Sequence, residues 1–165
     1  MTTRRLFFAL WPDEAGRSAL LAAAQPARAG VGAGGRAVPR GNLHLTLCFL
    51  GEIDAAAEVQ ARERAGAIRH PPVRVTFDAL EWWSGPRVQV ASASPDSTAP
   101  LAREICPHIK SFRAHVTLAR EVPQPLVRRV AIEPVTWHCE RFVLVESRQG
   151  APYSIVGEWP LYETR

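Results

Sequence analysis

The sequence predicts an α+β fold with a mostly antiparallel sheet. Short apolar runs of strand length alternate with segments that begin at helix-capping residues, and turn residues join several of these runs directly. A His-x-Thr sequence also occurs once in each half, at 44–46 and at 115–117, which suggests an internal duplication. With 165 residues, 47% of them apolar and 22% charged, the chain fits one globular domain of two lobes spanning 1–165.

The first half is expected to contain four strands and two helices. Asp13 and Asp54 are helix N-cap residues, each placed directly before a helical stretch. The glycine-rich segment 29–35 lacks the spacing and the lysine of a phosphate-binding loop, so we expect a flexible connection there. The expected strands are 5–10, 43–50, 73–80 and 87–91, and the expected helices are about 14–27 and 55–69.

The second half is expected to contain less helix. Pro100 starts a short helix within 95–109, and Pro107 interrupts it. The segment 123–130 is expected to form a short helix or a turn. The expected strands are 112–119, 139–145 and a closing strand within 153–162.

Composition narrows the cellular setting and the partner. The apolar run 6–11 is stopped by Pro12, and no run approaches the roughly 20 residues of a membrane span, so we expect a cytoplasmic protein without a signal segment. Cys48, Cys106 and Cys139 form no C-x-x-C pair and are odd in number, which predicts reduced, mostly buried thiols. A net charge of +4 favours an anionic partner such as nucleic acid.

The two His-x-Thr sequences are the main functional signal. Side chains alternate along a strand, so His44 and Thr46 share one face while their leucine neighbours share the other. His115 and Thr117 repeat this arrangement 71 positions later. One such sequence on a strand is common and is usually structural. Two copies with nearly identical apolar flanks favour a function.

The chemistry that needs this residue set is phosphodiester transfer or hydrolysis. One neutral imidazole removes a proton from the attacking oxygen while the other, as imidazolium, protonates the leaving oxygen. Histidine suits both tasks near neutral pH, because its unperturbed pKa is about 6.5. The threonine hydroxyls donate to the phosphate oxygens. These groups cover both proton transfer and charge, so we expect neither a metal nor another cofactor.

At these motifs the chain resembles the 2H phosphoesterase superfamily, and within it the RNA 2′,3′-cyclic phosphodiesterases formerly called 2′-5′ RNA ligases. The similarity covers nearly the whole chain. It is carried, in order, by 5–10, 42–52, 112–120, Tyr153 and 159–161. The chain departs from the family pattern at 110–114, where the family has Arg-Pro-Phe-x-Pro and this chain has Lys-Ser-Phe-Arg-Ala.

The resemblance implies a bilobal fold in which two antiparallel sheets flank a groove, with helices outside and a pseudo-two-fold relation between the lobes. It implies hydrolysis of a terminal 2′,3′-cyclic phosphate to a 2′-phosphate, together with weak reversible joining of RNA ends. His44 would be the general acid, His115 the general base, and Thr46 and Thr117 would bind the phosphate. The implied partner is RNA, and a monomer is our expectation.

Two further residues carry over from the resemblance. Phe49 would stack on the terminal base, and Arg120 would contact the phosphate. Each lies five positions after its histidine, and at that spacing simple strand alternation would point its side chain toward the core. A bulge or a strand end must therefore redirect them; otherwise they are a core phenylalanine and a surface arginine.

Several alternatives stay open. Trp82 and Trp83 could stack on bases, but paired tryptophans at a strand end are more often packing residues. His108 lacks a following threonine, and we expect it to be noncatalytic. Other functions compatible with the sequence are hydrolysis of a small cyclic nucleotide and noncatalytic binding of RNA ends.

Overall fold

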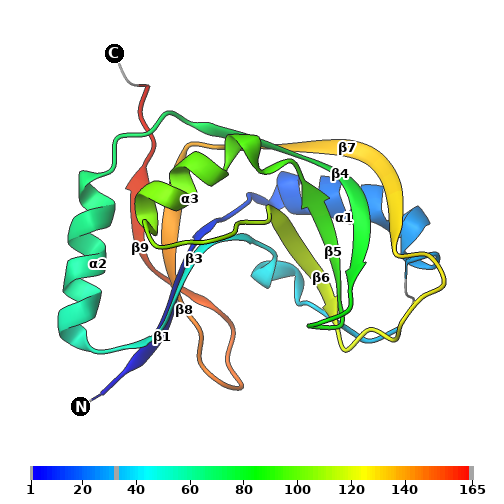
Figure 1. Ribbon diagram of the computed structural model, residues 1–165, viewed down its shortest axis with the longest axis horizontal. Coiled ribbons are helices and arrows are strands. Elements are labelled where there is room, and N and C mark those ends of the chain that lie inside the picture. The colour runs from blue at the N-terminus through cyan, green and yellow to red at the C-terminus, as the bar shows by residue number, and fades with distance from the viewer. Residues whose placement is uncertain (1, 32–33, 164–165) are drawn as a thin grey trace.

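The structure is a computed structural model that describes residues 2–31 and 34–163 (Figure 1), so part of the expected glycine-rich connection lies outside the described residues. Its α+β class and its mostly antiparallel sheet confirm the predicted fold class. The helices are α1 Glu14–Arg28, α2 Ala55–Ala67 and α3 Ala99–Ile105, with short 3₁₀ turns η1 Arg40–Asn42 and η2 Pro95–Ser97. The strands are β1 Arg4–Leu10, β2 Arg36–Ala37, β3 Leu45–Ile53, β4 Val73–Trp83, β5 Val88–Ala93, β6 His115–Arg120, β7 Arg129–Cys139, β8 Arg141–Glu146 and β9 Ser154–Pro160.

Both expected N-caps form. The Asp13 carboxylate accepts the backbone N–H of Gly16 at 2.7 Å, and the Asp54 carboxylate accepts that of Ala57 at 2.9 Å. Each bond satisfies one of the free N–H groups in the first turn of a helix. α1 and α2 therefore begin where the sequence predicts.

The sheet consists of two antiparallel halves that meet between β3 and β6. The strand order of the described residues is β7-β4-β5-β6-β3-β1-β8-β9, with β2 paired to β6. Figure 1 shows β1, β3, β8 and β9 on one side of the molecule and β4 to β7 on the other. Across the part of the chain that the structure describes, β3 and β6 share a single register pair, Leu45 with Val116. The two expected sheets are thus joined edge to edge at one point, and each half contributes one motif strand to the junction.

One local expectation is wrong and one strand is missing from the expected elements. Of the segment expected to form a short helix or a turn, 123–128 contain only irregular backbone with bends, and 129–130 already belong to the eleven-residue strand β7, which the sequence does not predict. β7 contains Pro134, which cannot donate a ladder hydrogen bond, and this hid the strand from sequence analysis. Because β7 is an edge strand, one side of its backbone needs no partner, so the proline is tolerated.

The main core cluster lies on the face opposite to the motif side chains. Leu45 and Val116, at the junction of the two halves, are fully buried in it. The core also takes in Leu20 of α1, Ala61 of α2 and Leu101 of α3, so each helix packs its apolar side into it. The helices thus leave the motif side chains to the opposite face. No helix in the described ranges has the length and apolar character needed to cross a membrane.

Candidate active site

The two His-x-Thr motifs meet across the junction between β3 and β6. Because Leu45 pairs with Val116 in antiparallel register, the next positions outward bring His44 opposite Thr117 and Thr46 opposite His115. Side chains alternate, so these four lie on the face opposite to the buried Leu45 and Val116. They line a groove of about 440 Å³ together with Phe49 and Arg120. All six residues singled out from the sequence therefore line one groove.

A bulge follows the threonine in each motif. Between β1 and β3, Ala9 pairs with Thr46 and Phe8 pairs with Cys48, which leaves Leu47 as an extra residue. Between β5 and β6, Val90 pairs with Thr117 and Gln89 pairs with Ala119, which leaves Leu118 as an extra residue. An extra residue reverses the alternation beyond it, so two consecutive buried residues are followed by one that faces outward.

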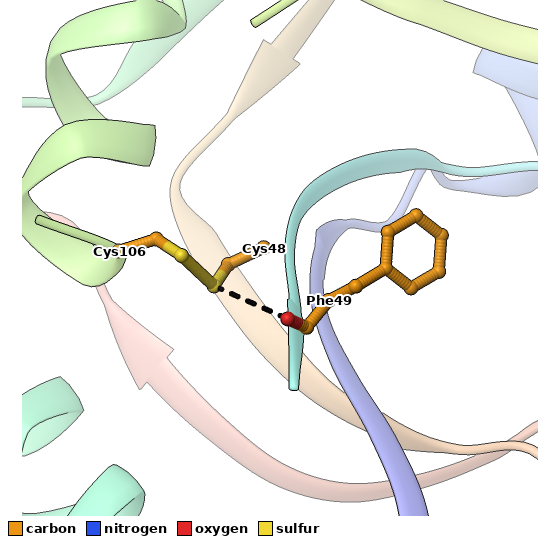
Figure 2. The surroundings of a disulfide bond; sticks show 3 residues. All are labelled: Cys48, Phe49 and Cys106. Carbon is orange, nitrogen blue, oxygen red and sulfur yellow. Dashed lines mark hydrogen bonds between the residues drawn. A yellow bond between two sulfur atoms is a disulfide. The ribbon is translucent and has the colours of Figure 1, made fainter. Parts of the chain in front are cut away.

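The bulges place Phe49 and Arg120 on the groove face. The burial patterns of 44–49 and 115–120 are identical: a half-buried histidine, a buried residue, a half-buried threonine, two buried residues and an exposed one. Phe49 is 70% exposed. Figure 2 shows its ring pointing away from the side on which Cys48 meets α3. Sequence analysis requires a bulge or a strand end to turn Phe49 and Arg120 toward the groove. A bulge between the threonine and this residue is present in both halves.

The prediction that every cysteine is reduced is wrong. Cys48 forms a disulfide with Cys106, which follows the last residue of α3 (Figure 2). Strand and helix patterns do not say that the end of α3 lies beside the β3 bulge, so the pairing could not be read from spacing. Cys139 is free and buried as expected, and burial raises the pKa of its thiol to about 11.

His44 is held by hydrogen bonds at both ring nitrogens. Its Nδ1 lies 2.6 Å from the Asn42 carbonyl oxygen. A carbonyl only accepts, so Nδ1 carries a hydrogen, and in the neutral ring the bare Nε2 accepts from the Thr46 hydroxyl at 3.0 Å. Trp11 stacks on the imidazole with ring centroids 5.4 Å apart and planes 10° apart, and Tyr153 meets it edge-on.

His115 is held in a similar way from the other half. Its Nδ1 donates to the Arg113 carbonyl oxygen at 2.6 Å, so the ring carries its hydrogen on the same nitrogen as His44. The Trp83 ring lies 4.4 Å from the imidazole, with the Arg113 guanidinium 3.7 Å from the centroid of the indole ring. Glu81 accepts the indole N–H at 2.8 Å and also pairs with Arg113. These contacts fix the Trp83 ring beside His115, where it lines one side of the groove.

Both histidines are neutral in the free protein at pH 7. Burial, followed by the positive charge of Arg120 and the proximity of His115, lowers the pKa of His44 to about 4 against the opposing hydrogen bond to Asn42. The pKa of His115 is also lowered, first by burial and then by the positive charges of Arg113 and Arg120. An anionic group in the groove would oppose these charge effects and favour protonation of either ring.

Sequence analysis did not assign Trp11 or Trp83 to the site. Trp82 is 6% exposed, and its indole N–H donates to the Val122 carbonyl oxygen, so the packing interpretation is right for it. Trp83 instead lines the groove. The alternation along β4 puts the two on opposite faces, and this signal could have separated them. Trp11 follows the end of β1 and has no comparable signal.

The described residues offer other cavities but no metal cluster. A larger hollow of about 990 Å³ lies between the start of α1 and strands β7 to β9, and it contains neither motif histidine. Within 2–31 and 34–163 no three histidine, cysteine, aspartate or glutamate side chains are grouped to hold a metal ion. We therefore place the candidate active site in the groove that holds both motifs.

Sequence comparison finds a family and a curated relative. The family described as LigT like Phosphoesterase matches residues 10–91, which include the first motif. The RNA 2′,3′-cyclic phosphodiesterase of Escherichia coli (strain K12) is 36% identical over 104 residues. That alignment covers 54% of this chain and 57% of the E. coli protein, so it spans less than two thirds of the relative.

Structure comparison covers both motifs. The apo crystal structure of E. coli LigT superposes with a TM-score of 0.82 at 27% identity, over 99% of this chain and all of that one. E. coli LigT complexed with 3′-AMP gives 0.82 at 26% identity, over 98% of this chain and 100% of that one. TT0787 of Thermus thermophilus gives 0.74 at 28% identity, over 95% of this chain and 97% of that one.

Proposed function

Because this chain belongs to the LigT-like phosphoesterases of the 2H superfamily, we propose that it hydrolyses the 2′,3′-cyclic phosphate at the end of an RNA to a 2′-phosphate. The observation that carries the proposal is the meeting of both His-x-Thr motifs in one groove across the β3–β6 junction. Two imidazoles on neighbouring strands can reach opposite sides of one phosphorus atom, as an in-line displacement requires.

The reaction needs one proton removed and one delivered. His115 takes a proton from water as the water oxygen attacks phosphorus. The bond from phosphorus to the ribose 3′-oxygen breaks, and His44 gives its proton to that oxygen, which leaves a 3′-hydroxyl and a 2′-phosphate. The two rings then exchange their protonation states through solvent. With a 5′-hydroxyl in place of water as the attacking group, His115 takes the hydroxyl proton and His44 again protonates the leaving 3′-oxygen, which forms a 2′-5′ phosphodiester and would account for weak 2′-5′ ligation.

The acid role of His44 requires it to gain a proton with the substrate. Its pKa of about 4 keeps it neutral in the empty groove. The phosphate anion offsets the charge of Arg120, and the face of Trp11 provides an electron-rich surface for an imidazolium. The hydrogen bond from Nδ1 to Asn42 also favours the protonated ring. Substrate binding thus favours the protonated form of His44, which is the form that acts as the general acid.

The remaining groove residues bind the substrate. The Thr46 and Thr117 hydroxyls and the Arg120 guanidinium donate to the nonbridging phosphate oxygens and stabilise the charge that grows there. Phe49, exposed on the groove face, stacks on the terminal base. The chemistry uses no metal ion, since protons and charge are both handled by side chains.

The experiment is hydrolysis of an oligonucleotide that ends in a 2′,3′-cyclic phosphate, with EDTA present and absent. We expect a 2′-phosphate product at equal rates in both. Absence of hydrolysis would refute the activity and favour the alternative of a noncatalytic RNA-end binder. Loss of activity in EDTA would refute the metal-free mechanism. A much faster reaction with a free 2′,3′-cyclic nucleotide than with the oligonucleotide would favour the small-substrate alternative.

A further inference from the structure

The reaction groove continues into a second cavity beyond His44. This cavity, of about 260 Å³, shares His44, Thr117, Arg120 and Tyr153 with the first groove. Its other walls come from the segment around β2 and from the turn before β9. A phosphate held between the two motifs would therefore lie at the boundary of both cavities, with Phe49 on the far side. The second cavity is therefore available to another chemical group of the same substrate.

Strand β2 places a second arginine in this cavity. β2 takes up the edge of β6 beyond the end of β3, and its Arg36 pairs with Arg120 in antiparallel register. Opposite residues of neighbouring strands project to the same face, so the two guanidinium groups share the groove face. Gly35 allows this close approach: a Cβ there would lie 2.5 Å from the Arg120 carbonyl oxygen, and its φ is 75°.

The charges in the second cavity are not balanced. Like charges directly opposite on paired strands repel and cost stability. Arg36 has one exposed partner, Glu121, at 3.6 Å, and both side chains are about two-thirds or more exposed. Within the described part of the chain Arg120 has no carboxylate partner. Two arginines that line one cavity, with one solvent-screened carboxylate beside them, suit a phosphate-sized anion.

We infer that Arg36 binds a second phosphoryl group of the substrate, the one on the 5′-oxygen of the terminal nucleotide. The inference rests on the proposed function, which puts the reacting phosphate between the motifs. The terminal nucleotide then has its base at Phe49, its cyclic phosphate at the histidines and its 5′-phosphate at Arg36. This contact selects nucleotides that belong to a chain, or that carry a 5′-phosphate, over a nucleoside cyclic phosphate. Arg36 is a specificity-determining residue in this account.

Binding of two product analogues tests the inference without catalysis. The probes are adenosine 2′-monophosphate and adenosine 2′,5′-bisphosphate, measured by calorimetry on the wild type, Arg36→Gln and Arg36→Lys. Arg36→Gln should weaken bisphosphate binding by about 10-fold to 100-fold, the usual range for a hydrogen bond to a charged group, and leave the monophosphate within about two-fold. Arg36→Lys should retain part of the affinity. The control Arg74→Gln, an exposed arginine on β4 outside both cavities, should bind like the wild type.

Equal weakening for both probes would overturn the inference, because Arg36 would then act on the reacting phosphate or on the fold. Unchanged bisphosphate binding would overturn it as well. Turnover of adenosine 2′,3′-cyclic phosphate and of its 5′-phosphorylated form provides the second arm, and Arg36→Gln should lower kcat/KM for the second substrate alone. If the wild type hydrolyses neither nucleotide and also fails on the cyclic-phosphate oligonucleotide, the proposed function fails, and the binding data still decide the role of Arg36.

Discussion

Reduction of the Cys48–Cys106 disulfide is expected to lower the free energy of unfolding by about 4 kcal/mol. The two cysteines are 58 residues apart in the sequence. The chain-entropy relation assigns a loop of that length about 14 cal/mol/K of lost unfolded-state entropy, which corresponds to about 4 kcal/mol at 25 °C. The loop contains α2 and the β4–β5 hairpin, so the bond ties the β3 bulge to the end of α3 across much of the fold.

Urea unfolding with and without a dithiol reductant measures this difference. With a typical slope of about 2 kcal/mol/M, the midpoint should fall by about 2 M on reduction. A Cys48→Ser/Cys106→Ser variant should unfold near the reduced wild type and should not respond to the reductant. Cys139→Ser keeps the pair and should respond like the wild type. An unchanged wild-type midpoint, or an equal response of the double serine variant, would refute this reasoning.

Two other predictions concern the groove. Phe49→Ala should raise KM for a cyclic-phosphate oligonucleotide by about 10-fold with little change in kcat, because it removes one stacking contact. The control Phe49→Tyr keeps an aromatic ring and should behave like the wild type. Steady-state kinetics that show a lower kcat at an unchanged KM for Phe49→Ala would contradict this prediction. The pKa of His44 is about 4 in the folded protein and about 6.5 when unfolded, so between these pH values the unfolded chain binds more protons. The stability from this group is complete above pH 6.5 and is lost as pH falls toward 4, by up to about 3 kcal/mol. Urea titrations across this window should show a smaller decline for His44→Gln, and equal declines would contradict the assignment.

The candidate site could be predicted largely from the strand period. Alternation puts each histidine and its threonine on one face and their aliphatic neighbours on the other, and the fully buried Leu45 and Val116 bear this out. The capping aspartates likewise position α1 and α2 correctly. These features depend on residues close in sequence, so the local pattern contains the necessary information.

Features that depend on distant segments could not be predicted. The bulges at Leu47 and Leu118 arise from register with β1 and β5, and neither strand is near its partner in the chain. The same holds for the disulfide, because the end of α3 reaches β3 only in the folded protein. β2, with only two residues, has no periodicity to detect. It nevertheless brings Arg36 to the groove.

The central claim is that His44 and His115 act as one acid/base pair in a single groove. Single-turnover rates of His44→Ala, His115→Ala and the double variant, on an oligonucleotide ending in a 2′,3′-cyclic phosphate, test it most directly. Each single substitution should cost about 10²-fold to 10⁴-fold. Because residues that work as a unit are not additive, the double variant should lose about as much as the worse single variant. Losses that multiply in the double variant, or near wild-type activity in either single variant, would contradict the account.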